Sequence, residues 1–207
     1  MSECAADTSW EGRWRAGDTP WDLGAPSPGV AEALRQGPLA EGPRRVLVPG
    51  AGAGHDAIAL ARAGHDVVAL DIAPTAIAAA RAAVELAGVE VLIVLGDLLA
   101  GAARSAAPFD VVFEHTCFCA LDPQDRPRYV DAVADVLGPA GALVAVLWEH
   151  GREGGPPFDV AGDAITAWFG RRFKEIRRID LAPFERRPGV ERLVTFALAP
   201  EGRLPVA

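Results

Sequence analysis

From residue 44 onward, short apolar runs rich in β-branched residues alternate with longer alanine-rich stretches. Apolar runs without a polar face are typical of strands buried in a parallel sheet, and the alanine-rich stretches between them predict crossover helices. The predicted strands span residues 45–49, 66–71, 89–95, 109–114 and 142–148. The predicted helices lie near 54–63, 74–87 and 124–137, and the Gly-Pro-Ala-Gly stretch at 138–141 is expected to stop the last one.

The pattern changes after residue 148. A loop rich in glycine and proline covers 149–157, a helix is predicted near 163–169, and two strands are predicted at 173–181 and 191–199. The link between these strands is too short for a crossover helix, so they are expected to pair antiparallel. The expected fold class is therefore α/β, with a doubly wound, mostly parallel, seven-stranded sheet and an antiparallel strand near its end.

Residues 1–30 show neither a helical nor a strand period, yet they contain Trp10, Trp14 and Trp21. A tail with these tryptophans would expose a large apolar area, so an ordered arm that packs on the rest of the chain is expected. With 207 residues, half of them hydrophobic, the chain can bury one sizeable core. We expect a single domain over 1–207, made of this arm and a core at 44–199.

Composition and charge disfavour several classes of function. The formal net charge of −8 gives no electrostatic drive toward nucleic acid. No apolar run approaches the ~20 residues of a membrane span, and the first residues lack the features of a signal peptide, so a cytoplasmic protein is expected. Three cysteines, two of them crowded at 117 and 119, do not make a disulfide framework.

A glycine-rich turn follows the first predicted strand. Gly50, Gly52 and Gly54 expose backbone N–H groups, and Asp71 stands about 20 residues further on, where a carboxylate can hold a ribose diol. This combination predicts a cofactor built on adenosine. His55 occupies the place of the third glycine in a dinucleotide fingerprint, which favours S-adenosylmethionine (SAM) over a nicotinamide dinucleotide.

A second carboxylate, Asp97, ends the third predicted strand, where it could accept a hydrogen bond from an adenine amino group. In an open α/β sheet, the carboxyl ends of the strands meet at the same crevice as the first turn. Either acid alone could instead be a helix cap, as the position of Asp71 before Pro74 and Thr75 suggests. A glycine turn with two acids at one edge favours a nucleoside site over two separate caps.

Three longer motifs accompany this turn. They are Trp10-x-x-x-Trp14-x-x-Gly17-x-Thr19-Pro20-Trp21-Asp22, the stretch from Phe109 to Pro123, and Gly154-Gly155-Pro156-Pro157-Phe158. With the Val-Pro-Gly-Ala-Gly turn, they make the chain resemble the thiopurine S-methyltransferase family of SAM-dependent methyltransferases, which also contains halide, thiocyanate and thiol methyltransferases. The resemblance covers nearly the whole chain and implies a Rossmann-like methyltransferase fold.

The resemblance implies a binding site for SAM, with S-adenosylhomocysteine (SAH) as the product. The residues that it assigns to the cofactor are Trp10, Trp14, Trp21, Gly50, Gly52, Asp71, Asp97, Leu98 and His115. Glu114 could hydrogen-bond the amino-acid end of the cofactor or anchor the loop that follows, and the sequence leaves both roles open.

The acceptor site is expected at His115, Cys117 and Phe158. His115 stands where family members have arginine or tyrosine, and an imidazole with its pKa near ~6.5 could accept a proton from a thiol acceptor. Phe158 follows a flexible pair and a stiff pair of residues and is expected to give the pocket an apolar wall. His115, Cys117 and Cys119 alternate along the chain, but a fourth ligand is not evident, so no metal is expected.

The leading function is methyl transfer from SAM to a small-molecule acceptor by in-line displacement, onto sulfur or a soft anion such as halide or thiocyanate. Two alternatives stay open: an NAD-dependent oxidoreductase and a non-catalytic SAM-binding domain. The oxidoreductase would want a Tyr-x-x-x-Lys motif, yet Val133 stands four residues after Tyr129, the sole tyrosine. The expected partner is the small acceptor alone, bound by a monomer that contacts neither nucleic acid nor membrane.

Overall fold

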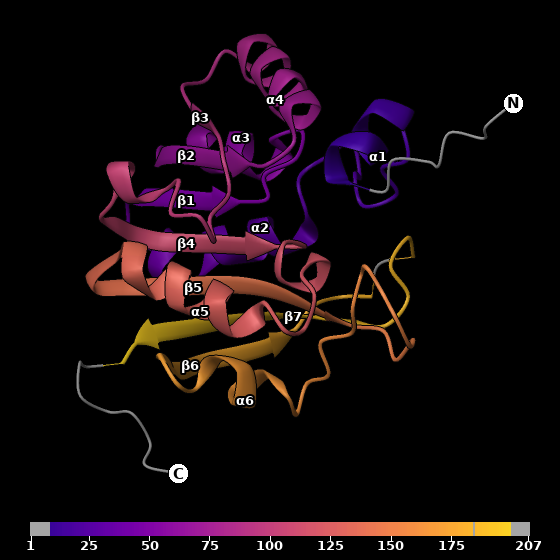
Figure 1. Cartoon of the computed structure of the whole chain (residues 1–207). Coiled ribbons are helices and arrows are strands. Elements are labelled where there is room, and N and C mark those ends of the chain that lie inside the picture. The colour runs from indigo at the N-terminus through magenta and orange to yellow at the C-terminus, as the bar shows by residue number, and fades with distance from the viewer. Residues whose placement is uncertain (1–8, 184, 200–207) are drawn as a thin grey trace, which may run out of the picture.

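A sheet of seven strands in the order β3-β2-β1-β4-β5-β7-β6 runs through the molecule (Figure 1). The computed structural model describes residues 9–183 and 185–199. All neighbouring pairs are parallel except those made by β7, which runs antiparallel to both β5 and β6. The strands are β1 (Arg45–Pro49), β2 (Asp66–Asp71), β3 (Leu92–Leu95), β4 (Phe109–His115), β5 (Leu137–Glu149), β6 (Phe173–Asp180) and β7 (Val190–Leu198). The predicted α/β sheet, mostly parallel with one late antiparallel strand, is confirmed.

Helices cover both faces of the sheet, as Figure 1 shows. The helices are α1 (Trp10–Ala16), α2 (Pro28–Arg35), α3 (His55–Arg62), α4 (Pro74–Ala87), α5 (Arg126–Val136) and α6 (Ile165–Phe169), with short 3-10 turns η1 (Pro38–Ala40), η2 (Arg104–Ala106) and η3 (Phe118–Ala120). Side chains of α2 and α3 pack in one hydrophobic cluster, and those of α5 and α6 pack in the other. α4 lies beside α3 and contacts β2 and β3.

Side chains of successive strand residues alternate between these two clusters. In β1, Val46 and Val48 pack with α2 and α3, while Leu47 between them packs with the cluster of α5 and α6. This alternation follows from the two-residue period of a strand, and it explains why the sequence shows continuous apolar runs: both faces of the strand are buried.

Two predicted strand boundaries differ from the structure by more than two residues. β3 begins at Leu92, because only residues from there onward pair with β2. β5 begins at Leu137, which pairs with Phe109, and the register then shifts so that Ala142 pairs with Val111. The residues at 138–141 therefore bulge out of the ladder inside one strand, where the sequence pattern predicts a separate helix stop.

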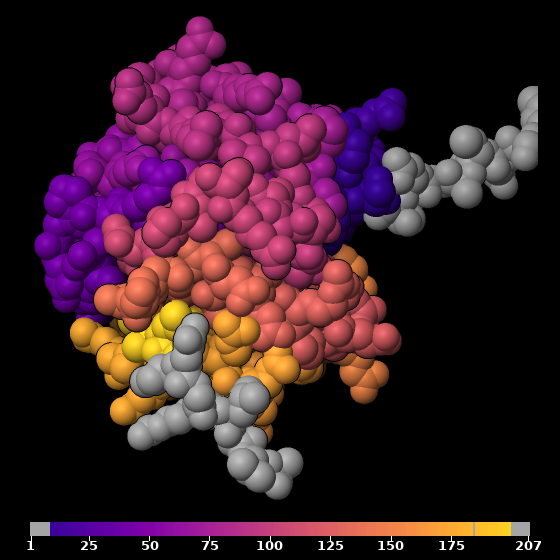
Figure 2. All heavy atoms as spheres, turned by 60° about the vertical axis from the view of Figure 1, so that its left-hand side comes forward, coloured from indigo at the N-terminus to yellow at the C-terminus, as the bar shows by residue number. Residues whose placement is uncertain are grey.

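The described part of the predicted arm begins at residue 9 and includes α1 and the start of α2; the part at 1–8 lies outside the described residues. α1 lies on the side toward which the arrows of β1 and β4 point (Figure 1), and Figure 2 shows this indigo part of the chain at the right-hand edge of the molecule. Ser27 caps α2 by accepting a hydrogen bond from the Val30 N–H at 3.1 Å, and Pro28 fixes its first turn. Within the described ranges, no helix combines the length and the apolar character needed to cross a membrane.

Gly29 of α2 allows this helix to lie directly on β5. A Cβ at this position would stand 2.3 Å from Cγ2 of Val146. Gly29→Ala is therefore expected to lower the free energy of unfolding by about 1–3 kcal/mol through overpacking. Urea denaturation measures this loss, and the double variant Gly29→Ala, Val146→Ala should recover part of it. Equal denaturation midpoints for Gly29→Ala and the wild type would contradict the close contact.

Candidate active site at the carboxyl edge of the sheet

A cavity of about 450 Å³ lies at the carboxyl edge of the parallel strands, under the arm. This size falls within the ~300–1,000 Å³ of small-molecule sites. The predicted site residues that line it are Trp10, Trp14, Trp21, Gly50, Gly52, Asp71, Asp97, Leu98 and Cys117. Glu114, His115 and Phe158 are not among the described residues that line it.

The glycine turn between β1 and α3 has the backbone conformation that glycine favours. Gly50, Gly52 and Gly54 all have positive φ, at 59°, 53° and 82°. A Cβ on Gly50 would stand 2.9 Å from the Cβ of Cys117, and one on Gly52 would stand 3.4 Å from the ring of Trp14. The turn thus needs glycines both for its backbone and for the close approach of its neighbours.

Asp71, the last residue of β2, fixes this turn. Its Oδ2 accepts a hydrogen bond from the Gly52 N–H at 2.8 Å, and its Oδ1 accepts one from the Ala73 N–H at 2.9 Å. A carboxylate offers about four lone-pair sites, so acceptor capacity remains beyond these bonds. Burial raises the pKa of Asp71, and the N–H groups of Ala73, Gly52 and Ile72 offset part of that rise. A buried carboxylate with unused acceptor capacity at a cavity wall fits a vicinal diol.

Asp97 follows β3 at the same edge. Its Oδ1 accepts a hydrogen bond from the Leu99 N–H at 2.8 Å, which closes a tight turn. Leu98, within this turn, is buried and contributes an apolar wall of the cavity. The pair presents one carboxylate and one apolar surface to the cavity, a combination that suits a planar ring carrying an amino group.

The three tryptophans of the arm form an aromatic cluster over the cavity. The ring of Trp21 meets Trp10 at 5.2 Å and Trp14 at 6.2 Å, both edge to face. The guanidinium of Arg13 lies 4.3 Å from the Trp21 ring centroid, within cation–π range, and its Nε donates to Asp18 at 2.8 Å.

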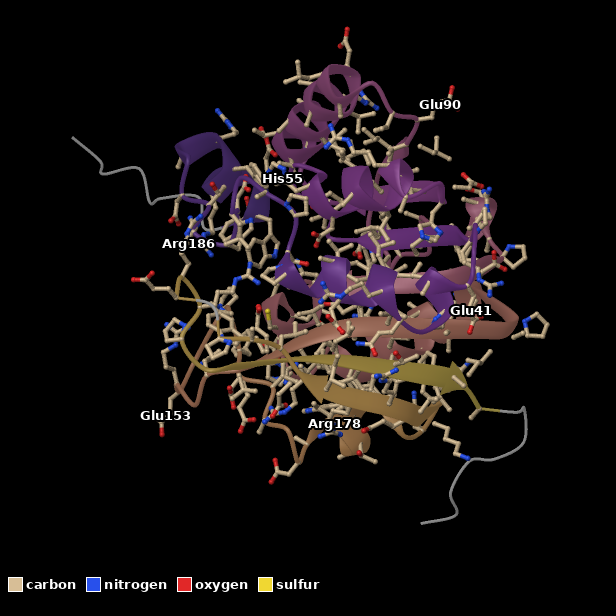
Figure 3. The ribbon with its side chains drawn as sticks, turned by 180° about the vertical axis from the view of Figure 1, so that it is seen from behind. Glu41, His55, Glu90, Glu153, Arg178 and Arg186 are labelled. Atoms are coloured by element: carbon tan, nitrogen blue, oxygen red, sulfur yellow. The ribbon has the colours of Figure 1, made fainter. Side chains whose placement is uncertain are left out.

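The arm docks on the start of α4. The carboxylate of Glu11 accepts hydrogen bonds from the Thr75 N–H at 2.9 Å and from the Thr75 hydroxyl at 2.7 Å. A carboxylate at a helix N-terminus satisfies an otherwise unpaired N–H group and interacts favourably with the helix dipole. His55 Nε2 and Asp22 Oδ1, 3.1 Å apart, make a second link, now to the start of α3. Figure 3 shows His55 on the arm side of the molecule.

His115 ends β4 and lies behind the glycine turn, against a smaller recess of about 60 Å³. Its Nδ1 is 2.7 Å from Oδ2 of Asp56, and its Nε2 is 2.5 Å from Nη1 of Arg187. Both ring nitrogens therefore have protein partners, and His115 is not among the described residues that line the large cavity. A proton transfer from the acceptor to His115 would require these contacts to change.

Glu114 is fully buried, and its partners are internal. Its Oε1 accepts a hydrogen bond from the Phe118 N–H at 2.7 Å, and its Oε2 accepts one from the Tyr129 hydroxyl. Of the two roles that the sequence left open, this geometry matches the anchoring of the loop that follows β4.

Phe158 also lies differently from the expectation. Its ring lies back over its own loop, next to Gly155: a Cβ on that glycine would stand 2.5 Å from Cγ of Phe158. Its backbone N–H donates to the Cys119 carbonyl at 2.7 Å, and its carbonyl accepts from Arg126 at 3.3 Å. The preceding residues, Pro156 and Pro157, line the cavity instead.

Thr116 has a φ of 65° and is the single non-glycine residue with positive φ between residues 9 and 199, residue 184 aside. This conformation is strained for a β-branched residue. It turns the chain sharply after β4, so that both Thr116 and Cys117 line the cavity. Nothing in the sequence signals this turn.

The sequence interpretation also missed four arginines at the cavity wall: Arg13, Arg152, Arg186 and Arg187. Arg187 is buried and pairs with Glu191 at 2.9 Å, and Arg186 donates to the Leu23 carbonyl at 3.1 Å. Figure 3 shows Arg186 on the arm side, opposite Glu41. Arg152 lies 5.1 Å from the Trp148 ring, and within the described part of the chain neither Arg152 nor Arg186 forms an ion pair.

The cavity wall therefore combines two chemically different sets of groups. Two carboxylates and a glycine turn without side chains fit the ribose and adenine of an adenosine cofactor, while the tryptophans offer aromatic faces to a positive centre. The other set consists of guanidinium groups. Among the described residues, no three His, Cys, Asp or Glu side chains are grouped so that they could hold a metal ion.

Comparison with known proteins identifies the family of this chain. The sequence model of the thiopurine S-methyltransferase family matches residues 5–193. A probable thiol methyltransferase 2 of Arabidopsis thaliana is 37% identical over 164 residues, which cover 78% of this chain and 70% of the relative. Thiocyanate methyltransferase 1 of Brassica oleracea is 34% identical over 169 residues, covering 78% and 71%.

Solved structures show the same fold. The 1,6-didemethyltoxoflavin-N1-methyltransferase of Burkholderia thailandensis, solved with SAH, is 18% identical and superposes with a TM-score of 0.70 over 91% of this chain and 84% of its own. The N-methyltransferase NodS of Bradyrhizobium japonicum WM9, also with SAH, is 20% identical, with a TM-score of 0.68 over 93% and 94%. The dinucleotide alternative is not favoured. The chain belongs to the thiopurine S-methyltransferase family and is a SAM-dependent methyltransferase.

Proposed function

We propose that this enzyme methylates small acceptors that enter the cavity as soft anions: ionised aromatic thiols, thiocyanate or halide. The names of the relatives, a thiol and a thiocyanate methyltransferase, support this class of acceptor. The observation that carries the proposal is the part of the cavity wall with Arg152, Arg186 and Arg187, here called the acceptor end, where the described residues include guanidinium groups but no free proton acceptor.

At the cofactor end, Asp71 would hold the ribose hydroxyls and Asp97 the adenine amino group, with Leu98 against the ring. Gly50 and Gly52 line the cavity without a side chain. SAM, when bound there, supplies a methyl group that its positive sulfonium has already activated. The rings of Trp10, Trp14 and Trp21 would attract that charge, each contact contributing about 0.5–2 kcal/mol, and would exclude water.

At the acceptor end, Arg152 and Arg186 have no carboxylate partner among the described residues, so their positive charges can attract an anion. Arg187, which is paired with Glu191, adds N–H donors. Pro156 and Pro157 provide apolar surface next to them. A soft anion with an apolar body, such as an aromatic thiolate, suits this mixture of charge and apolar wall.

The cysteine and tyrosine side chains at this end stay protonated near neutral pH, so they cannot accept a proton from the acceptor. Burial raises the pKa of Cys117 well above its usual range and that of Cys119 to about 12. Burial also raises the pKa of Tyr129, whose hydroxyl is bound to Glu114. Because His115 is engaged on both nitrogens, the described residues at this end offer no ready proton acceptor near neutral pH. The acceptor must therefore lose its proton to solvent.

A labelled-methyl assay with thiols of graded pKa, thiocyanate and iodide tests this proposal. For each thiol, kcat/KM should rise about tenfold per pH unit below the thiol's own pKa and level off above it, because the thiolate is the nucleophile. Rates with thiocyanate should stay flat over the same range. A shared pKa near ~6.5 for all thiols would instead reveal a histidine base. Binding of SAH without turnover of any acceptor would favour the non-catalytic alternative.

We further propose that the chain acts as a cytoplasmic monomer and as one domain, with a small-molecule partner only. The net charge of −8 supports the absence of a nucleic-acid partner.

A further inference from the structure

A chain of buried polar groups links α3 to the loop between β6 and β7. Asp56 contacts His115 at 2.7 Å, His115 contacts Arg187 at 2.5 Å, and Arg187 contacts Glu191 at 2.9 Å. The side chains of Asp56 and His115 are each 11% exposed, and that of Arg187 is 5% exposed. Groups so far apart in sequence meet here because the start of α3, the end of β4 and the loop between β6 and β7 lie at the same edge of the sheet.

The arm is attached to two members of this chain of contacts, Arg187 and Asp56. Nη2 of Arg187 donates to the Trp21 carbonyl at 3.0 Å, and the Ser27 N–H donates to Oδ1 of Asp56 at 2.6 Å. The segment between Trp21 and Ser27 is therefore held by the same groups that hold His115.

The contacts fix one tautomer of His115. The guanidinium of Arg187 can only donate, so Nε2 of His115, 2.5 Å away, accepts with its lone pair. Nδ1 then carries the proton and donates to Oδ2 of Asp56, whose Oδ1 accepts from the Ser27 N–H.

Arg187 has hydrogen-bonding capacity left. A guanidinium has five N–H donors, and the described residues take three of them, at His115, Glu191 and the Trp21 carbonyl. Arg187 also lines the large cavity. One side chain thus touches the arm and faces the end of the cavity where we propose that the acceptor anion binds.

We propose that Asp56 and His115 are positioning residues, which hold Arg187 so that one guanidinium binds the anionic acceptor and the closed arm together. This inference rests on the anionic acceptor proposed above. Since the arm covers the cofactor site, acceptor and cofactor should bind cooperatively, and the coupling must be reciprocal. An anion alone should therefore strengthen the binding of SAH, without any turnover.

The test measures the dissociation constant of SAH by calorimetry, with and without thiocyanate, and KM and kcat for thiocyanate. In the wild type, saturating thiocyanate should tighten SAH about threefold to tenfold. In Asp56→Asn, the amide N–H₂ would face Nδ1 and drive the proton to Nε2, so two donors would meet at Arg187. KM for thiocyanate should rise about tenfold with kcat within about threefold, and the tightening of SAH should vanish.

His115→Gln should rescue the arrangement, because one amide can donate to Asp56 and accept from Arg187. For His115→Gln, KM for thiocyanate and the tightening of SAH by thiocyanate are expected within about threefold of the wild type. His115→Phe should behave like Asp56→Asn. His65→Gln is the matched control: His65 is also buried, but it bonds the Arg44 N–H at the opposite end of β2 and should change neither value. If Asp56→Asn does not fold, the two His115 variants test the inference: His115→Gln should keep the wild-type KM and the tightening of SAH, and His115→Phe should lose both.

Wild-type KM and coupling in both Asp56→Asn and His115→Phe would overturn this inference while leaving the proposed function intact. Failure of the wild type to methylate any anion would overturn the proposed function itself, and this inference with it.

Discussion

Replacing Asp71 by alanine is expected to weaken the binding of SAH by about 100-fold or more. The substitution would remove the carboxylate that we propose accepts hydrogen bonds from the two ribose hydroxyls, and each such bond to a charged group contributes about 1.5–3 kcal/mol. Two lost bonds amount to about 3–6 kcal/mol, at about 1.4 kcal/mol per tenfold change. The same substitution also leaves the Gly52 N–H without its acceptor, so the glycine turn loses its tether to β2.

Asp71→Asn separates the two contributions. One amide oxygen can still accept from the Gly52 N–H, but the N–H₂ group would face the Ala73 N–H, which is itself a donor. We expect a loss of about tenfold in SAH affinity, between those of the wild type and the alanine variant. Calorimetric titration with SAH measures all three proteins.

Asp66→Ala provides the control for Asp71→Ala. Asp66 begins the same strand, is largely exposed and pairs with Arg45 at the opposite edge of the sheet. Its substitution should leave SAH affinity unchanged. A Kd of Asp71→Ala within about twofold of the wild type would show that the ribose is held elsewhere.

The sequence predicts the cofactor end of this site well, because its signals are local. A buried strand, three glycines with positive φ and an acid at the end of the next strand stand close together in the chain, and the parallel pairing of β1 with β2 brings them together. The prediction that the tryptophan arm contacts the cofactor depended on the family resemblance. The spacing of its residues does not indicate that Glu11 accepts hydrogen bonds from Thr75, 64 residues away.

The acceptor end depends on contacts that no local pattern contains. The role of His115 is set by Asp56 and Arg187, which are 59 and 72 residues away. Arg186 and Arg187 reach the cavity only because β6 runs parallel to β1, which puts the loop after it at the carboxyl edge. The antiparallel pairing of the last two strands was predicted, but their position in the sheet was not, and that position brings the guanidinium groups to the site.

We expect Glu114, next to the site, to contribute to stability through its two internal hydrogen bonds. Glu114→Ala would remove the acceptor for two buried donors, the Phe118 N–H and the Tyr129 hydroxyl. Each unsatisfied donor costs about 1–3 kcal/mol, so the free energy of unfolding should fall by about 3–5 kcal/mol. Thermal unfolding should show a Tm lower by about 6–20 °C.

Glu114→Gln should behave differently, because the amide oxygen can accept from the Phe118 N–H and the amide N–H₂ can donate to the Tyr129 oxygen. Burial raises the pKa of Glu114, and the N–H of Phe118 and the hydroxyl of Tyr129 offset this only in part. As pH rises through the ordinary value of 4.5, the unfolded chain loses this proton while the folded protein keeps it. The stability of the wild type therefore falls until the raised pKa is passed, and then levels off.

The glutamine variant lacks this loss, so its stability relative to the wild type should increase as pH rises above about 4.5. Urea denaturation at several pH values measures the difference, with Glu90→Gln at an exposed position as the control (Figure 3). A difference that stayed constant with pH, or that increasingly favoured the wild type, would mean that Glu114 is already ionised in the folded protein at low pH. In that case Tyr129 and Phe118 would stabilise a buried carboxylate beside the active site, and Glu114→Gln would be destabilising at neutral pH.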